Sequence, residues 1–116
     1  MSTVKLVLEY DGTCYAGWQR QPDHPTIQEA VEQAIHQVSQ ATVSVIGAGR
    51  TDSGVHALGQ VASFRTDRDW SASDWMRALN AVLPKDISVR SSALMDDNFH
   101  AQHDARGKLY TYRILH

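Results

Sequence analysis

The chain has 116 residues, of which 42% are hydrophobic and 21% charged; this composition fits one globular domain and excludes a disordered or fibrous chain. A domain of this length buries roughly two-thirds of its unfolded surface, so it can form a core without disulfides. Eleven basic and thirteen acidic residues give a net charge of −2, so charge balance alone does not indicate nucleic-acid binding. Eight of the basic residues are nevertheless Arg, whose planar guanidinium suits phosphates better than Lys does.

Cysteine content and hydropathy indicate the cellular compartment. Cys14 is the only cysteine, which excludes an internal disulfide and favours a reducing compartment. No apolar run approaches the roughly 18 residues that a membrane span needs, and the first ten residues lack the pattern of a signal peptide. We therefore expect a soluble, cytoplasmic protein without a membrane partner.

The apolar pattern predicts strands and helices that follow one another along the chain. The first strand covers residues 4–10 and is followed by a long loop up to Pro25. Thr26 and Glu29 fit a capping box, with Thr26 as N-cap and Glu29 reaching back, and begin a helix of about fifteen residues. The remaining expected elements are strands at 42–48 and 60–66, a helix capped by Ser71 or Ser73 and stopped by Pro84, and strands at 87–94 and 109–115.

This order of elements predicts an α+β fold of the ferredoxin-like, split βαβ type: β-α-β-β-α-β plus one strand, in a largely antiparallel sheet with both helices on one face. RNA-recognition modules often bind single-stranded RNA on such a free sheet face, although the fold hosts many unrelated functions. We expect residues 1–116 to form a single domain. The chain ends at His116 directly after a strong strand, which suggests a fragment of a longer protein.

A glycine-dense loop carries the most informative residues. Four of the seven glycines lie between Gly47 and Gly59, and glycines let a backbone approach a ligand or adopt positive φ. The loop is neither a P-loop nor a dinucleotide fingerprint. It combines Arg50, Asp52 and His56, and an arginine can hold a catalytic carboxylate ionised and oriented. On spacing alone a structural turn is the better interpretation, because Asp and Gly are favoured turn formers.

The loop at residues 10–21 mixes aromatic side chains with Gln and Arg. Such a mixture can stack on bases and contact phosphates; alternatively, Tyr15 and Trp18 pack as a satellite core. Cys14 in this loop is better interpreted as an inert small residue than as a nucleophile, because no base lies at a fixed offset.

Two further groups of residues leave their role open. His100 and His103 lie near two aspartates, but no third ligand has a clear spacing, so we do not expect a metal site. Tyr110 and Tyr112 share one face of the last strand and can be either base-stacking residues or ordinary core.

Several segments stand in a characteristic order: YDG at 10–12, GWQRQ at 17–21, TIQE at 26–29, GRTDSGVHA at 49–57, NAVLP at 80–84, FHA at 99–101 and KLYTY at 108–112. The same segments occur in this order in the TruA family of tRNA pseudouridine synthases, which the chain resembles over almost its whole length. The GRTDSGVH segment is the most specific of them, and with it the interpretation of Asp52 changes from a turn residue to a catalytic one.

The resemblance implies an enzyme that isomerises uridines at positions 38 to 40 of the tRNA anticodon stem-loop, without cofactor or metal. Asp52 would be the nucleophile, Arg50 would help to extrude the target nucleotide and take its place, and Tyr110 would pack against the flipped base. Arg20 and Lys108 are candidate phosphate contacts.

Arg113 is a further candidate phosphate contact. The sequence departs from the family pattern at Gln102, which stands where the family usually has an arginine. Family members are also about twice as long, with a second domain that completes the cleft and helps to form a homodimer. The resemblance therefore implies that this chain is the N-terminal domain of such an enzyme. A non-catalytic RNA-binding module and a purely structural ferredoxin-like domain are the alternatives.

Overall fold

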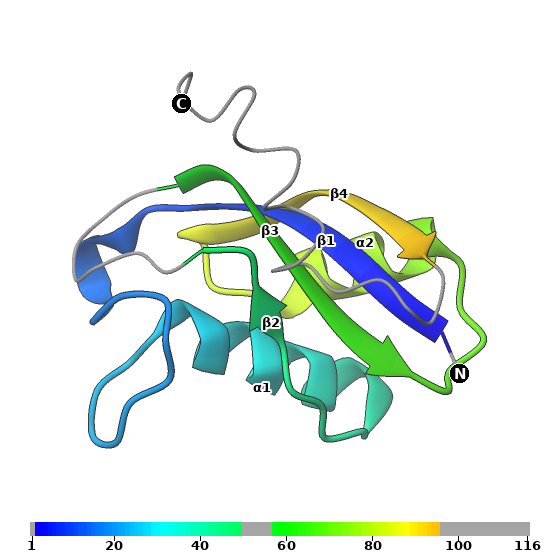
Figure 1. The fold of residues 1–116 in the computed structure, drawn as a ribbon, viewed down its shortest axis with the longest axis horizontal. Coiled ribbons are helices and arrows are strands. Elements are labelled where there is room, and N and C mark those ends of the chain that lie inside the picture. The colour runs from blue at the N-terminus through cyan, green and yellow to red at the C-terminus, as the bar shows by residue number, and fades with distance from the viewer. Residues whose placement is uncertain (1, 50–56, 96–116) are drawn as a thin grey trace.

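The computed structural model describes residues 2–49 and 57–95. Its elements are β1 (Ser2–Tyr10), the 3-10 turn η1 (Gly12–Cys14), α1 (Ile27–Ser39), β2 (Ile46–Gly47), β3 (Ala57–Thr66), α2 (Ala72–Val82) and β4 (Ile87–Met95). Figure 1 shows how they follow one another. The predicted strand at 109–115 lies outside the described residues.

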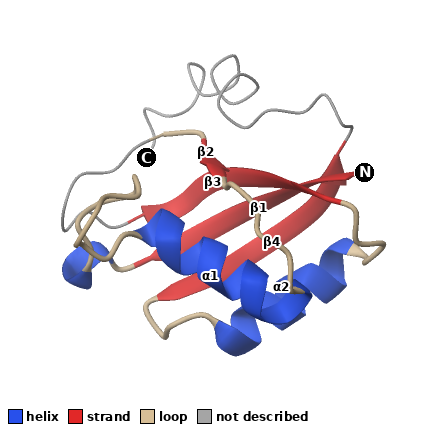
Figure 2. Ribbon diagram, turned by 90° about the horizontal axis from the view of Figure 1, so that it is seen from below, coloured by secondary structure: helices blue, strands red, loops and turns tan. Residues whose placement is uncertain are grey.

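The four described strands form one antiparallel sheet in the order β2-β3-β1-β4. Both helices lie on the same side of this sheet (Figure 2). The strand order, with β1 between β3 and β4, is that of a split βαβ arrangement. The predicted α+β fold is therefore confirmed.

Alternation along β1 explains why this strand lies at the centre. Every second residue of β1 points toward the helices and is at most 3% exposed; strand side chains alternate between the two faces, so one face of the sheet is apolar. These residues pack against buried side chains from both helices and the neighbouring strands: Ile27, Val31, Ala34, Ile35, Ala62, Phe64, Trp75, Leu79, Ile87 and Val89.

Both helices begin at hydroxyl caps. Thr26 Oγ1 accepts a hydrogen bond from the Glu29 amide at 3.3 Å, and Ser71, rather than Ser73, caps α2 by accepting from the Asp74 amide at 3.1 Å. These bonds satisfy amides that have no partner inside a helix. The Glu29 carboxylate does not complete the expected capping box; it pairs instead with Arg20 at 3.4 Å.

The predicted strand at 42–48 was too long. In the structure β2 comprises Ile46 and Gly47 alone. Just before β2 the backbone contacts a helix: the Val45 N–H donates to the Glu32 carboxylate, and its carbonyl accepts from the Gln28 side chain. Both backbone groups of Val45 are thus bonded to α1, and the pairing with β3 starts at the next residue, Ile46.

The opposite edge of the sheet, β4, is also paired by a helix side chain. Asn80 of α2 donates to the Val89 carbonyl at 3.0 Å and accepts from the Val89 amide at 2.7 Å. The register of β4 against β1 shifts at this point, between Val7 and Leu8. Asn80 therefore satisfies the backbone where the strand pairing is interrupted.

We expect Asn80→Ala to lower the free energy of unfolding by about 1–3 kcal/mol, because two hydrogen bonds to the Val89 backbone are lost. Arg77→Ala is the matched control: Arg77 is exposed on the same helix and makes a 3.8 Å ion pair with Asp74, so its change should stay within about 0.5 kcal/mol. Urea unfolding of both variants measures the difference. Equal losses would contradict the role given to Asn80.

Candidate functional site

The structure describes one of the six predicted site residues, Arg20, which lies in the loop between η1 and α1. The other five lie outside the described residues: Arg50, Asp52, Lys108, Tyr110 and Arg113. The two histidines considered as metal ligands, and Gln102, lie outside them as well. The flanks of the glycine-rich loop are described, and they show where that loop leaves and rejoins the sheet.

The loop leaves the sheet after β2 and returns at the start of β3 (Figure 1). The Gly49 carbonyl accepts a hydrogen bond from the Gln60 side chain at 2.5 Å, and the Ala48 amide donates to the Val61 carbonyl at 2.8 Å. On the other side, Ala57 pairs with Tyr10 at the end of β1. Both flanks are therefore fixed on the sheet.

An open pocket of about 390 Å³ lies beside the point where the loop returns. Leu58 and Tyr10 give it an apolar wall; the other lining residues are Glu9, Asp11, Lys85, Asp86 and Ser88. Leu58 is 72% exposed. With more carboxylates than ammonium groups in the lining, the pocket disfavours a phosphate and suits an uncharged polar ring.

The carboxylates of this pocket are bound by neighbouring groups. Asp11 accepts from the Thr13 amide and hydroxyl at 3.0 and 2.5 Å. Asp86 accepts from the Tyr15 hydroxyl at 2.8 Å, and Glu9 lies 3.7 Å from the Arg90 guanidinium. Within residues 2–49 and 57–95, no group of three or more His, Cys, Asp or Glu side chains is placed to hold a metal ion.

The hydrogen bond between Tyr15 and Asp86 joins the loop after β1 to the turn before β4. Burial of the ring, followed by the hydrogen bond and the charge of Asp86, raises the pKa of Tyr15 well above its usual value. The hydroxyl therefore stays protonated at neutral pH and acts as a donor rather than as a base.

The N-terminus of α1 is occupied by the same loop. The amides of Ile27 and Gln28 donate to the carbonyls of Gly17 and Trp18 at 3.1 and 3.0 Å, and the third amide is taken by the Thr26 cap. Helix N-termini often bind phosphates through such amides. Here these three donors already have protein partners, so they do not provide that site.

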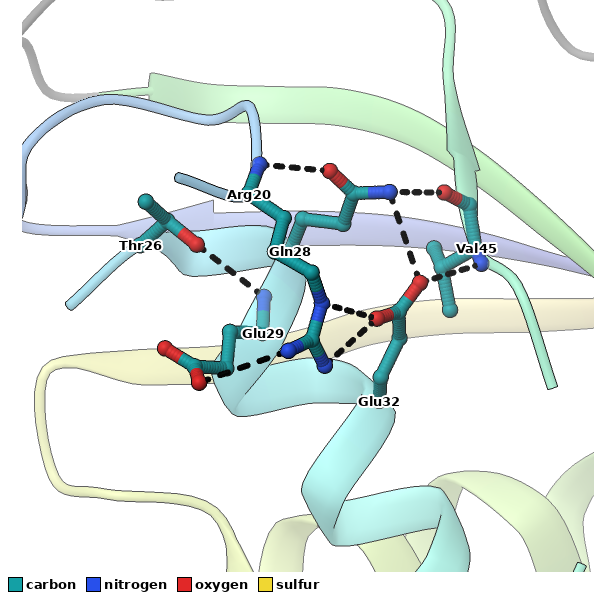
Figure 3. A network of polar contacts seen from close by, with 6 residues as sticks. All are labelled: Arg20, Thr26, Gln28, Glu29, Glu32 and Val45. Atoms are coloured by element: carbon teal, nitrogen blue, oxygen red, sulfur yellow. Dashed lines mark hydrogen bonds and ion pairs between the residues drawn. The ribbon is translucent and has the colours of Figure 1, made fainter. Parts of the chain in front are cut away.

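Arg20 belongs to a polar network on the flank of α1 (Figure 3). Its guanidinium lies 2.8 Å from the Glu32 carboxylate and 3.4 Å from Glu29, and its side chain is 48% exposed. Gln28 joins the network by accepting from the Arg20 amide at 2.7 Å and donating to the Val45 carbonyl at 3.1 Å. Arg20 is thus held by acidic side chains, and its assignment as a phosphate contact stays a prediction.

Trp18 packs in the main core, not on the surface. It is 2% exposed and stacks with Tyr10, the ring centroids 6.4 Å apart. A Cβ at Gly47 would lie 2.6 Å from its indole ring, well inside contact distance. Of the two interpretations of this loop, base stacking and packing, the structure supports packing for Trp18. Cys14 is exposed at the end of η1.

We expect Gly47→Ala to destabilise the protein by about 1–3 kcal/mol, because the buried indole cannot move away from the new methyl group. Gly59→Ala is the matched control. A Cβ at Gly59 would lie 3.9 Å from Val7, an ordinary contact. Thermal unfolding should show a lower midpoint for the first variant alone; an unchanged midpoint would disprove the close contact.

Two polar residues of this region were not singled out as functional from the sequence alone. Gln28 and Glu32 are four residues apart on α1 and both contact Val45. Their spacing indicates a shared helix face, but it does not tell which backbone the side chains reach.

In the described residues no helix is long and apolar enough to cross a membrane.

The fold and the site now define a class of protein: a split βαβ domain in which the two flanks of a glycine-rich loop are fixed on the sheet beside an open pocket. The family model described as tRNA pseudouridine synthase matches residues 6–104. The chain belongs to this tRNA pseudouridine synthase family.

Curated relatives carry the same description. The chain is 46% identical over 98% of its length to tRNA pseudouridine synthase A of Maridesulfovibrio salexigens, and 51% identical over 98% to that of Oleidesulfovibrio alaskensis. It is 47% identical over 99% to tRNA pseudouridine synthase A 2 of Clostridium perfringens. These matches cover 42%, 44% and 47% of the relatives, so the chain spans less than half of their length.

Proposed function

We propose that this chain is the part of a tRNA pseudouridine synthase that supplies the nucleophile, and that the intact protein isomerises uridine at positions 38 to 40 of the tRNA anticodon stem-loop. The observation that carries this proposal is the family match over residues 6–104, which includes the GRTDSGVH segment. The relatives are named for this reaction on tRNA.

In the proposed reaction, the Asp52 carboxylate attacks the target uridine at the base or at the ribose. This attack forms a covalent bond to Asp52, the bond between the ribose and N1 of the base breaks, and the base turns. A bond from the ribose to carbon C5 then forms, the bond to Asp52 breaks and frees the carboxylate, C5 loses its proton, and N1 gains one. Substrate and product have the same atoms and oxidation state, so the reaction balances without a cofactor. A paired uridine must leave its stack before this can happen.

The described pocket supports this proposal by its position and its charge. It adjoins Leu58, which follows Asp52 by six residues, and the fixed carbonyl of Gly49 precedes Asp52 by three. Three residues span at most about 11 Å, which limits how far Asp52 can lie from Gly49. An acidic, partly apolar pocket favours an uncharged uracil over the phosphate backbone.

The other proposed contacts follow from the family resemblance. Arg50 takes the place of the extruded nucleotide, and Tyr110 packs against the flipped base. Lys108 and Arg20 contact phosphates, the latter from a position half exposed beside α1. We further propose that the intact protein acts in the cytoplasm as a homodimer, in which a second domain completes the cleft around this one.

A non-catalytic RNA-binding module is the alternative, and neutralising Asp52 distinguishes the two. In the intact protein, Asp52→Asn should abolish pseudouridine formation, because it keeps the side chain's size but removes the nucleophilic charge. Binding of tRNA should stay within several-fold. Pseudouridine mapping on unmodified tRNA, combined with a binding assay, measures both. Retained turnover in the variant would disprove the assignment.

Residues 1–116 alone should fold but form no measurable pseudouridine. A half-site leaves the carboxylate and the flipped base open to water, and enclosure is what makes charge stabilisation effective in an active site. Incubating the purified 116-residue chain with unmodified tRNA and mapping pseudouridine tests this. Robust product would show that a second domain is dispensable.

A further inference from the structure

Val45 is held by two side chains of α1 just before the chain enters β2. Its amide donates to Glu32 Oε2 at 2.9 Å, and its carbonyl accepts from Gln28 Nε2 at 3.1 Å. Positions 28 and 32 lie one helical turn apart and therefore share a face of α1. We call the pair Gln28 and Glu32 the α1 clamp (Figure 3).

A few other described contacts hold this part of the backbone: the Trp18 indole packs against Gly47, and the Gly49 carbonyl accepts from Gln60. β2 pairs with β3 through Ile46 and Gly47, and the Ala48 amide adds one bond to Val61. The Val45 side chain is 1% exposed, so its position is coupled to the core. The α1 clamp is therefore a main constraint on where the chain leaves for the glycine-rich loop.

The chemistry of Glu32 requires a carboxylate. Its Oε1 accepts from Arg20 Nε at 2.9 Å, and its Oε2 accepts from the Val45 amide and, at 3.4 Å, from Gln28 Nε2. Every partner is a donor, so both oxygens must be acceptors. An amide at position 32 would turn its NH₂ group toward one of these donors. The Glu32 side chain is 11% exposed, so water does not readily replace a lost bond.

We propose that Glu32, acting with Gln28, is a positioning residue for the pseudouridine-forming reaction. By holding Val45 it fixes the path through Gly47 and Gly49 to the loop that carries Asp52. The inference rests on the proposed function, in which Asp52 is the nucleophile. A shift of about 1 Å in a reacting group costs on the order of a hundredfold in rate, so a loosened clamp lowers turnover without removing any substrate contact.

The test compares Glu32→Gln with Glu29→Gln in the intact protein. Both changes remove one negative charge from α1 and one partner from Arg20, but Glu29 contacts Arg20 at 3.4 Å and makes no side-chain bond to Val45 among the described interactions. Glu29→Gln therefore reports what loosening Arg20 does by itself. The measurements are kcat and KM for pseudouridine formation on unmodified tRNA, and hydrogen exchange at the Val45 amide.

For Glu32→Gln we expect kcat to fall by about tenfold or more, KM to stay within about twofold, and the Val45 amide to exchange faster. For Glu29→Gln we expect kcat to stay within about twofold, because in the described structure Glu29 contacts Arg20 and not Val45. A change in KM that both variants share reports the loss of a partner of Arg20 and is separate from the clamp. Gln28→Met removes the bond to the Val45 carbonyl, together with the bond from the Arg20 amide, and keeps the Glu32 carboxylate. It should lower kcat by a smaller factor than Glu32→Gln does. This second variant tests the clamp even where Glu32→Gln does not fold.

Equal kcat in the folded Glu32 and Glu29 variants would overturn the inference. A lower kcat in Glu32→Gln with unchanged hydrogen exchange at the Val45 amide would also overturn it, because the effect would then not pass through the clamp. If Glu32→Gln does not fold, an unchanged kcat in Gln28→Met would overturn the inference instead. Failure of the proposed function gives a different result: the unsubstituted intact protein forms no pseudouridine at all, and the inference then falls with it.

Discussion

The contact between the Trp18 ring and the backbone of Gly47 is the constraint on which the β2 edge of the sheet depends. The ring is 2% exposed and also stacks with Tyr10 of β1, so it connects the centre of the sheet to its edge. Protein interiors are close-packed, and a buried ring has little space into which it can move. β2 can therefore approach only where residue 47 has no side chain. Gly47, at the start of the glycine-rich loop, is therefore needed for packing inside the domain.

The two edges of the described sheet are paired in the same way. Gln28 of α1 bonds to the backbone of Val45 beside β2, and Asn80 of α2 bonds to Val89 in β4. A side-chain amide carries a donor and an acceptor, so each can satisfy backbone groups that no neighbouring strand reaches. Unpaired edges are sites of unwanted strand addition. The helices thus supply the core with apolar side chains and the edges with amides.

The sequence predicted the fold class, the helix layer and the first strand because each depends on a periodic pattern. Alternation in β1, hydroxyl caps at Thr26 and Ser71, and Pro84 after α2 are all local signals. The length of β2 was not predictable in this way. Its β-branched residues favour a strand, but the residue before β2 bonds to a side chain thirteen positions earlier, Glu32, and such a long-range contact leaves no local pattern.

The candidate site shows the same limit. The motif at 49–57 predicted a loop and proposed Asp52 as the nucleophile. The pocket beside the flanks of that loop is formed by the ends of three strands and their turns, and no single segment carries its pattern. Tyr15 shows why: its partner Asp86 lies 71 residues away. Trp18 shows a second limit: an aromatic residue in a polar loop has the same local sequence whether it stacks on a base or packs in a core. Only its place in the fold distinguishes the two roles.

Electrostatics separates the two kinds of RNA contact that the proposed function needs. The pocket holds three carboxylates near the loop of Asp52, and the Thr13, Tyr15 and Arg90 groups that bind them moderate their charge. Phosphates must be bound elsewhere, and the cluster of Arg20, Glu29 and Glu32 has a net charge of −1 as it stands. An Arg20 that binds a phosphate must therefore give up a carboxylate. The ion pair with Glu29 is the longer of the two, at 3.4 Å between nitrogen and oxygen, compared with 2.8 Å for Glu32. The Glu29 side chain is also more exposed than that of Glu32, at 31% compared with 11%. Release of Glu29 alone frees one side of the guanidinium and leaves the α1 clamp intact, so phosphate binding and the positioning of the loop do not compete for the same carboxylate.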